Sequence, residues 1–202
     1  MRSDTKAKAT GKAGIVGPVQ IYTGKGDDGT TGLLYGGRVR KDADPIEVNG
    51  AVDEAQAALG LARAHGHGDV ELDALLVDLE RDLYVLMAEV ATLPENRSKL
   101  APGVTLVTEG MVADLEARID TLTETFAMPT EFVVPGQNLV AAALDVARTT
   151  VRRAERLAVA AGLVDSFVIP YLNRLSDLVW TMARWQEGEH FELAKARREA
   201  GR

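Results

Sequence analysis

The segment 22–31 reads Tyr-Thr-Gly-Lys-Gly-Asp-Asp-Gly-Thr-Thr, and its residue types suit the binding of phosphate. Its three glycines let backbone N–H groups approach a ligand closely, which favours phosphate oxygens. Lys25 can supply a positive charge, and the hydroxyl groups of Thr23, Thr30 and Thr31 can donate hydrogen bonds. The segment is not a P-loop, because no Gly-Lys-Thr or Gly-Lys-Ser follows the required spacer. Alone, it is consistent with a phosphate-binding loop or with a flexible polar turn.

A run of arginines between residues 148 and 156 is the second group with chemical potential. At about 100° per residue, one arc of a predicted helix collects Asp145, Arg148, Arg152, Glu155 and Arg156. Every cation of the run is arginine, whose planar fork suits carboxylate or phosphate recognition. The same donor geometry suits a salt-bridge seam between helices. The two interpretations are compatible, because one arginine can brace the fold while its neighbour binds a ligand.

Two further predicted helices place polar groups among apolar ones. Asp53 shares a helix face with Asn49 and Gln56. It is a candidate partner for an arginine of the run, or an acid that complements the dipole of its own helix. Asn173 and Asp177 lie one turn apart and are flanked by leucines, which is consistent with a buried polar network or with a ligand contact.

Composition limits the class of protein. The 202 residues are 46% hydrophobic and 26% charged, which is typical of a globular domain. No apolar run approaches the about 20 residues that cross a bilayer, so we expect no membrane insertion. A net charge of −7 argues against nucleic acid as a general partner. The absence of cysteine excludes disulfides and thiolate metal sites and fits a reducing compartment, so we expect a cytoplasmic protein.

The elements that position these groups are predicted to be helices. Leucines recur along one stripe of the second helix, at Leu72, Leu75, Leu76, Leu79, Leu83 and Leu86. Periodicity predicts five helices, over Glu47–Ala64, Val70–Thr92, Thr105–Thr125, Asn138–Ala161 and Pro170–Glu189, with Pro170 at the first helical position. Long helices with short connections predict an all-α five-helix bundle with ferritin-like up-down packing. We assign 21–191 to this single domain, 1–20 to a disordered tail and 192–202 to a frayed tail.

Three segments then form an ordered set of motifs. The loop 22–31 comes first, and Gly50-Ala51-Val52-Asp53-Glu54 comes second. The third runs from Ala147-Arg148 through Arg152-Arg153-Ala154-Glu155-Arg156 to Leu172-Asn173-Arg174-Leu175-Ser176-Asp177. Together they resemble the PduO-type ATP:cob(I)alamin (corrinoid) adenosyltransferases over about residues 21–185. One departure is Gly24 followed by Lys25, where that family usually has a lysine or arginine directly after the first threonine.

The resemblance implies a cobalamin adenosyltransferase-like bundle that forms a homotrimer with ATP bound between neighbouring subunits. The implied ATP contacts come from the loop, a following lysine and two helices: Tyr22, Thr23, Lys25, Gly26, Asp27, Gly29, Thr30, Thr31, Lys41, Arg152, Glu155 and Asn173. The implied catalytic residues are Arg152, Arg148 and Asp53, with Arg148 and Asp53 paired across the subunit boundary. Phe132 would face the corrinoid.

The implied reaction is attack of cob(I)alamin on the 5′ carbon of ATP, which forms adenosylcobalamin and releases triphosphate. ATP and cob(I)alamin are thus the expected substrates, and Mg²⁺ is expected with the phosphates rather than in a metal site of the protein. A corrinoid reductase and an adenosylcobalamin-dependent enzyme are the expected partners. The chemistry needs no protein nucleophile, so His65, His67 and His190 are not expected to act in catalysis.

Two alternatives from other classes stay open at this point. A regulatory trimer could bind ATP without chemistry, and the displaced Lys25 is the best support for it. A structural assembly protein could use the arginine run as an interface seam. Corrinoid-dependent triphosphate release would separate the enzyme from the first alternative, and ATP binding would separate it from the second.

Overall fold

A computed structural model describes residues 21–163 and 165–195 of the chain. This part contains five long helices, as predicted: α1 Asp44–His65, α2 Val70–Val90, α3 Glu109–Thr123, α4 Leu139–Ala160 and α5 Val168–Glu187. The tail predicted over 1–20, and residues 196–202 of the tail predicted at the other terminus, lie outside the described residues.

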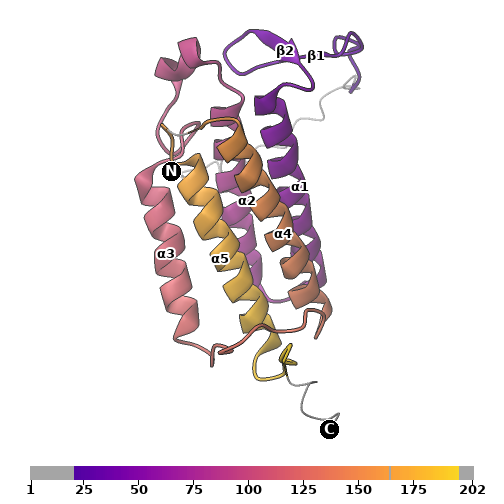
Figure 1. Cartoon of the computed structure of the whole chain (residues 1–202), viewed down its shortest axis with the longest axis vertical. Coiled ribbons are helices and arrows are strands. Elements are labelled where there is room, and N and C mark those ends of the chain that lie inside the picture. The colour runs from indigo at the N-terminus through magenta and orange to yellow at the C-terminus, as the bar shows by residue number, and fades with distance from the viewer. Residues whose placement is uncertain (1–20, 164, 196–202) are drawn as a thin grey trace, which may run out of the picture.

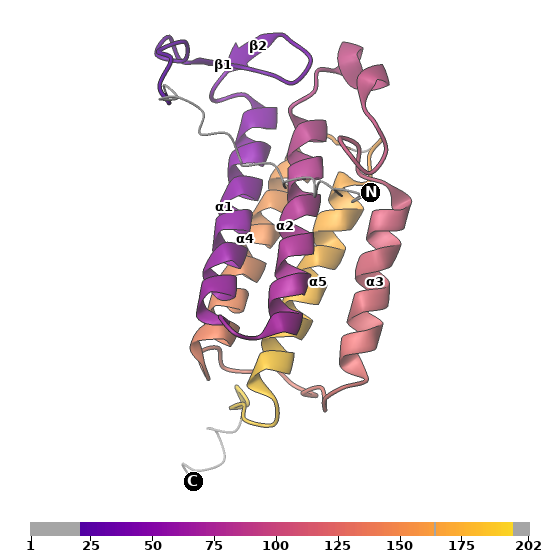
Figure 2. The ribbon, with the colours of Figure 1, turned by 180° about the vertical axis from the view of Figure 1, so that it is seen from behind.

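The five helices run alternately up and down along one axis (Figure 1), so the predicted up-down bundle is confirmed. α1 packs against α2 and α4, and α5 packs against α4 and α3. One end of the bundle carries the start of α1, the α2–α3 link and the α4–α5 link. The opposite end carries the α1–α2 link and the α3–α4 link (Figure 2). None of the described helices is long and apolar enough to cross a membrane.

The core follows the predicted apolar stripes. The buried leucines of α2 are Leu72, Leu76, Leu79, Leu83 and Leu86, whereas Leu75 at the edge of the stripe is half-buried. α4 lies between α1 and α5, and its fully buried side chains are mostly small, among them Ala147, Ala154 and Ala158. Small side chains allow helices to approach closely. The apolar arc of α4 is therefore fixed in the core, which leaves Arg152 and Arg156 of the polar arc exposed, whereas Asp145 of the same arc is buried.

α1 and α5 begin at other residues than predicted, and each has a proline in its first turn. α1 begins at Asp44 rather than Glu47, because Pro45 fits the first turn of a helix, where an N–H would have no intrahelical acceptor. α5 begins at Val168, so Pro170 is its third residue and not its first. Both prolines lie within the first turn of their helix, where the missing N–H of proline costs no intrahelical hydrogen bond.

The start of α3 is also later than predicted. Thr108 caps the helix, because its hydroxyl oxygen accepts a hydrogen bond from the N–H of Met111 at 3.3 Å. Thr105, the predicted start, lies in the preceding turn and accepts a hydrogen bond from the N–H of Ala101 at 2.8 Å. The α2–α3 link also contains a 3-10 helix that was not predicted, η1 Pro94–Lys99.

A small hairpin precedes α1 and was not predicted. Strand β1 Thr30–Gly32 pairs antiparallel with β2 Arg38–Arg40. The turn of the hairpin is tied to the end of α2, because the N–H of Leu34 donates to the carbonyl of Ala91 at 2.9 Å. The hairpin therefore covers the end of the bundle where α1 begins and α2 ends (Figure 1).

A second pairing lies at the opposite end of the bundle. Residues 192–195, which the sequence assigned to a frayed tail, pair with the α3–α4 link. The N–H of Val134 donates to the carbonyl of Glu192 at 2.8 Å, and the N–H of Ala194 donates to the carbonyl of Phe132 at 2.9 Å. Backbone hydrogen bonds thus hold the segment at Phe132 and at Val134.

Candidate active site

The loop 22–31 precedes β1 and has a defined turn structure. Gly24 and Gly29 have φ of +67° and +79°, values that glycine adopts without steric cost. The N–H of Asp27 donates to the carbonyl of Gly24, and the N–H of Gly29 donates to the carbonyl of Gly26, both at 3.2 Å. The loop extends beyond the outer side of α1 (Figure 1). Its exposed backbone and side chains are available to a ligand or to a neighbouring copy of the chain.

Asp28 and Thr30 form an internal contact of this loop. One carboxylate oxygen of Asp28 accepts from the backbone N–H of Thr30 at 2.9 Å and from its hydroxyl at 2.7 Å. The hydroxyl hydrogen bond is the main reason that the pKa of Asp28 lies below its usual value. The hydroxyl proton of Thr30 is therefore directed to Asp28 in this conformation.

Arg38, on β2, also contacts the loop and was missed by the sequence analysis. Its Nη2 donates to the carbonyl of Lys25 at 2.6 Å and to the hydroxyl oxygen of Thr30 at 2.6 Å. Its Nε donates to the same hydroxyl oxygen at 3.0 Å. No local pattern in the sequence indicates that a residue 8 to 13 positions downstream reaches back in this way.

Two lysines lie near these groups, as predicted. A Cβ atom placed on Gly26 would lie 3.2 Å from Nζ of Lys41, so this ammonium group lies over the loop. Lys25 is exposed. Neither lysine forms an ion pair with a carboxylate of the described residues. Both charges are therefore free to meet an anion.

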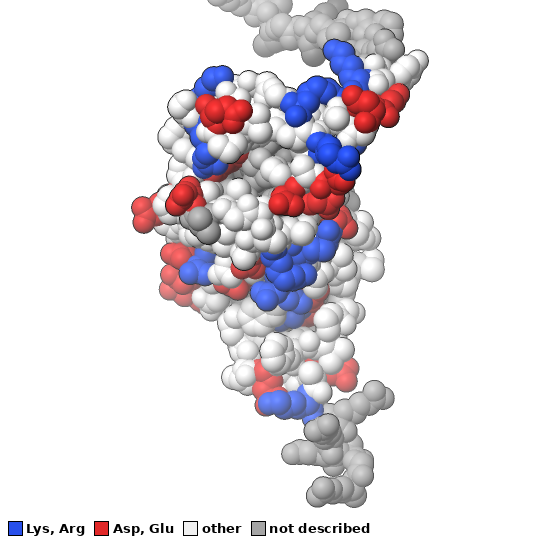
Figure 3. Space-filling view, turned by 45° about the horizontal axis from the view of Figure 1, so that its top comes forward, with Lys and Arg blue, Asp and Glu red and all other residues white. Residues whose placement is uncertain are grey.

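The arginines of α4 divide between two roles. Arg153 forms an ion pair with Glu54 of α1, so it braces the two helices. Arg152 and Arg156 are exposed, and neither is paired with any residue that the structure describes. The run therefore contains one arginine that joins two helices, Arg153, and two arginines without an ion-pair partner among the described residues, Arg152 and Arg156. Seen from the hairpin end, basic side chains gather in a patch on the side of the bundle and again beside the hairpin (Figure 3).

Arg148 and Asp53 do not meet within one chain. Arg148 Nε lies 3.5 Å from a carboxylate oxygen of Asp145, is buried, and has no hydrogen-bond acceptor among the described residues. Asp53 is exposed on α1 and has no ion pair within the described part of the chain. Their pairing remains a prediction about two neighbouring copies.

Glu155 and Asn173, both predicted to line the nucleotide site, contact each other. The side-chain amide of Asn173 donates to a carboxylate oxygen of Glu155 at 2.9 Å. Arg174 donates to the amide oxygen of Asn173 at 2.6 Å and to Glu116 of α3 at 2.7 Å. Asn173 is thus oriented by a partly buried network that joins α3, α4 and α5.

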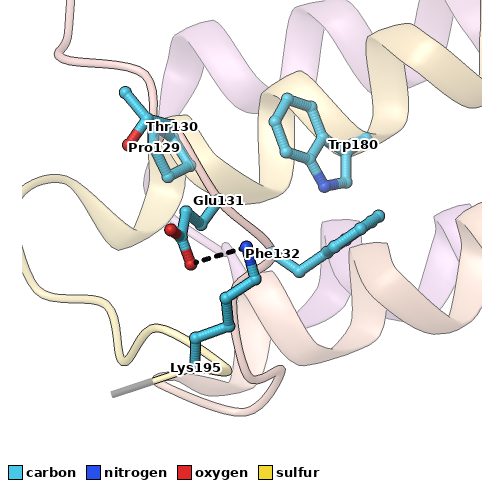
Figure 4. Close-up of a pocket in the computed structure, with 6 residues that line it drawn as sticks. All are labelled: Pro129, Thr130, Glu131, Phe132, Trp180 and Lys195. Carbon is cyan, nitrogen blue, oxygen red and sulfur yellow. Dashed lines mark ion pairs between the residues drawn. The ribbon is translucent and has the colours of Figure 1, made fainter.

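Phe132 lies at the opposite end of the bundle from the hairpin, and its side chain is 83% exposed. It borders a hollow of about 320 Å³ that is lined by Pro129, Thr130, Glu131, Phe132, Trp180 and Lys195. Figure 4 shows the indole of Trp180 and the ring of Phe132 on one side of this hollow, and the ion pair of Lys195 with Glu131 on the other. Trp180 was not singled out from the sequence, because a tryptophan on the apolar side of a helix is ordinarily part of the core.

A buried ion network adjoins Trp180. The guanidinium of Arg184 lies 5.9 Å from the indole ring centre and is 2% exposed. It donates to Asp145 at 2.7 Å and lies 2.8 Å from a carboxylate oxygen of Glu187. Burial, and secondarily the charge of Asp145, raises the pKa of Glu187 above its usual value. This network links the wall of the hollow to Arg148, because Asp145 contacts both arginines.

The candidate residues therefore form three groups along the bundle. The loop and Lys41 lie at one end, Phe132 and Trp180 lie toward the other, and the face with Arg152, Glu155 and Asn173 lies between them. One chain does not bring the loop together with the α3–α4 link, which contains Phe132 (Figure 1). Within the described residues, no group of three or more His, Asp or Glu side chains could hold a metal ion.

Comparison with known proteins gives a consistent result. A sequence profile described as "Cobalamin adenosyltransferase" matches residues 21–186. A corrinoid adenosyltransferase of Citrobacter freundii is 38% identical over 171 residues, which is 83% of this chain and 95% of that protein. One from Mycobacterium tuberculosis is 39% identical over 82% of this chain and 87% of its own length.

Solved structures of one bacterial enzyme share this fold. A variant of the PduO-type ATP:corrinoid adenosyltransferase from Lactobacillus reuteri, complexed with cobalamin and ATP, superposes with a TM-score of 0.73 at 28% identity. The match covers 83% of this chain and 90% of the other. These matches show that the chain belongs to the cobalamin adenosyltransferase family. Within that family it is a corrinoid adenosyltransferase of the PduO type.

Proposed function

We propose that the protein transfers the 5′-deoxyadenosyl group of ATP to the Co(I) form of a corrinoid and releases triphosphate. The observation that carries this proposal is the family match over residues 21–186, which spans both the glycine-rich loop and the arginine face of α4. In the reaction, Co(I) supplies the electron pair of the new cobalt–carbon bond. The bond between C5′ and the α-phosphate oxygen breaks, and its electrons leave with triphosphate.

The nucleotide end of the site is the loop with its two lysines. Lys25 and Lys41 are free of ion pairs among the described residues, and the loop glycines expose backbone N–H groups. These donors suit the triphosphate, and Arg152 suits the negative charge that grows on it as the C5′–oxygen bond breaks. Catalysis here needs positioning and charge stabilisation rather than a protein nucleophile.

Mg²⁺ enters this account with the triphosphate. Among the loop carboxylates, Asp27 makes no side-chain hydrogen bond with a described residue, whereas Asp28 is occupied by Thr30. Asp27 would therefore hold the ion, together with phosphate oxygens. The ion would neutralise part of the charge of the leaving triphosphate.

The corrinoid end is the hollow beside Phe132. Apolar rings from Phe132 and Trp180 present a surface suited to a flat macrocycle, and they would exclude water from its lower face. Exclusion of an axial ligand favours four-coordinate Co(II), which is more easily reduced to Co(I). Asp145 and Arg184 support this wall from within the bundle.

A homotrimer would bring the separated groups together. In a cyclic assembly, one face of each chain meets a different face of its neighbour. The exposed Asp53 of one copy would supply the acceptor that Arg148 Nε lacks within its own chain. A corrinoid reductase would supply Co(I), and an adenosylcobalamin-dependent enzyme would take up the product.

An anaerobic assay with ATP and chemically reduced cobalamin tests the proposal. The expected result is formation of a cobalt–carbon bond, seen in the absorption spectrum, with one triphosphate released per corrinoid consumed. ATP binding without this reaction would identify a regulatory protein instead. The absence of ATP binding in a thermal-shift titration would favour a structural assembly protein.

A further inference from the structure

We propose that Arg38 is the residue that positions the phosphate loop, and that it does so without contacting the phosphates itself. The inference deepens the proposed function, on which its kinetic part rests. Arg38 comes from β2, yet its guanidinium reaches both sides of the loop turn. It donates to the carbonyl of Lys25 and to the hydroxyl oxygen of Thr30, each at 2.6 Å, and also to the carbonyl of Thr30 at 3.2 Å.

These contacts have an entropic consequence. A loop with several glycines loses much conformational freedom when it becomes ordered on a ligand. Arg38 ties residues 25 and 30 to one rigid group before any ligand arrives, so part of that ordering is already present in the free protein. A preorganised loop binds its ligand more tightly than a loop that must order on binding.

The contacts need the planar fork of arginine. Both Nε and Nη2 reach Thr30, while Nη2 also reaches the carbonyl of Lys25. A lysine has one compact ammonium group and cannot reproduce this arrangement. Substitution by lysine therefore removes the tie and keeps the charge.

The positively charged side chains around the loop have two different roles. The donors of Arg38 already bond to loop oxygens, and its charge is partly balanced by Asp28 at 3.6 Å. Lys25 and Lys41 have no such partners among the described carboxylates. The lysines are therefore the phosphate contacts, and Arg38 holds the backbone from which Lys25 extends.

The test compares Arg38→Lys with Arg40→Ala. Arg40 lies on the same strand, is exposed, and pairs only with Asp42 among the described residues, so its loss removes a charge without untying the loop. Two properties are measured for each variant. The first is the rate of trypsin cleavage after Lys25 in the ligand-free protein. The second is the steady-state dependence on ATP with Co(I) in excess.

For Arg38→Lys we expect faster cleavage after Lys25, with protection restored by saturating ATP. We also expect the KM for ATP to rise about tenfold, the size that follows from the loss of a charge-assisted hydrogen bond, with kcat unchanged. Arg40→Ala should match the wild type in both properties. If cleavage and KM for Arg38→Lys also match the wild type, Arg38 does not position the loop.

Two other outcomes would also overturn the proposal. A fall in kcat without a change in cleavage or KM would mean that Arg38 acts on the leaving triphosphate. A rise in KM without faster cleavage would mean that it contacts ATP directly. The cleavage assay needs no enzymatic activity, so it separates failure of this inference from failure of the proposed function.

Discussion

The two ends of the bundle are built in different ways. At the hairpin end, a glycine-rich polar loop is held by the side chain of Arg38 and extends beyond α1. At the other end, Phe132 is held by backbone hydrogen bonds to residues 192–195, beside the indole of Trp180. A triphosphate requires exposed donors, whereas a corrin ring requires an apolar wall, and each end is suited to one of these.

The distance between the ends has a mechanistic consequence. α4 has 22 residues, so it spans about 33 Å at about 1.5 Å per residue. Transfer requires C5′ and cobalt to be in contact. The loop of one chain is therefore badly placed to deliver ATP to the hollow of the same chain. We infer that the loop of one chain delivers ATP to the hollow of a neighbouring copy. Arg152 would lie between the loop and that hollow.

Arg152 is the point where we expect the largest loss. Arg152→Ala should lower kcat/KM about 10²–10³-fold, the effect of removing one donor to a developing negative charge. Because Arg152 is exposed and unpaired among the described residues, stability should change by no more than about 0.5 kcal/mol. The matched control is Arg156→Ala on the same helix, which should retain most activity. Equal losses in both variants would mean that α4 provides only a general positive field.

Phe132→Ala should affect the corrinoid end alone. We expect ATP affinity to stay near the wild-type value while the four-coordinate Co(II) signal falls in absorption or magnetic circular dichroism spectra. The activity defect should be largest when reduction starts from protein-bound Co(II), and smaller with free Co(I). The control is Val134→Ala, since Val134 is in the same segment but does not line the hollow. Loss of ATP binding with an unchanged cobalt spectrum would reverse the assignment of the two ends.

Ala194→Pro should have a smaller effect at the same end. Proline lacks the N–H that Ala194 donates to the carbonyl of Phe132, so one backbone tie is lost while the aromatic ring remains. We expect the KM for the corrinoid to rise several-fold with no change in the KM for ATP. Glu192→Ala, which removes an exposed side chain of the same segment but keeps the backbone carbonyl that accepts from Val134, is the control. A parallel rise in both KM values would show that the change is global.

The smallest expected effect is a pH dependence. The pKa of Glu187 is raised in the folded protein, so this carboxyl contributes stability that is fully present below its ordinary pKa and is lost as pH rises through the folded value. The side chain of Glu187→Gln is neutral at every pH, so the variant lacks this pH dependence of stability. In urea titrations from pH 4 to 7, the stability of the wild type relative to Glu187→Gln should therefore decrease as pH rises. A difference that stays constant with pH would contradict the assignment.

Local patterns in the sequence predicted what depends on local physics. The leucines of α2 and the exposed Arg152 and Arg156 of α4 follow helical periodicity and occupy the expected faces, whereas Asp145 of the polar arc is buried. The hairpin was missed, because strands of three residues show no useful alternation. The contact of the Thr30 hydroxyl with Asp28, two residues earlier, was not predicted.

What could not be predicted depends on distant contacts. Arg38 reaches back to Lys25, and Arg184 pairs with Asp145 across 39 residues of sequence. Ala194 bonds to Phe132 although its segment carries several charged residues and suggests a tail. Each contact depends on the direction of two separate elements, and no single segment contains that information.

A mixed-oligomer experiment tests most directly whether the site lies between copies. One chain carries Arg152→Ala, and the other carries Gly29→Val with Lys41→Ala, so each chain alone lacks one half of the site. Co-expressed chains are purified through two different tags. If each site joins the loop of one chain to the α4 face of its neighbour, activity should return to about a third of wild type, because in every trimer that carries both tags one neighbouring pair in three combines two intact halves. Activity no higher than that of the two variants assayed separately would contradict a site shared between chains.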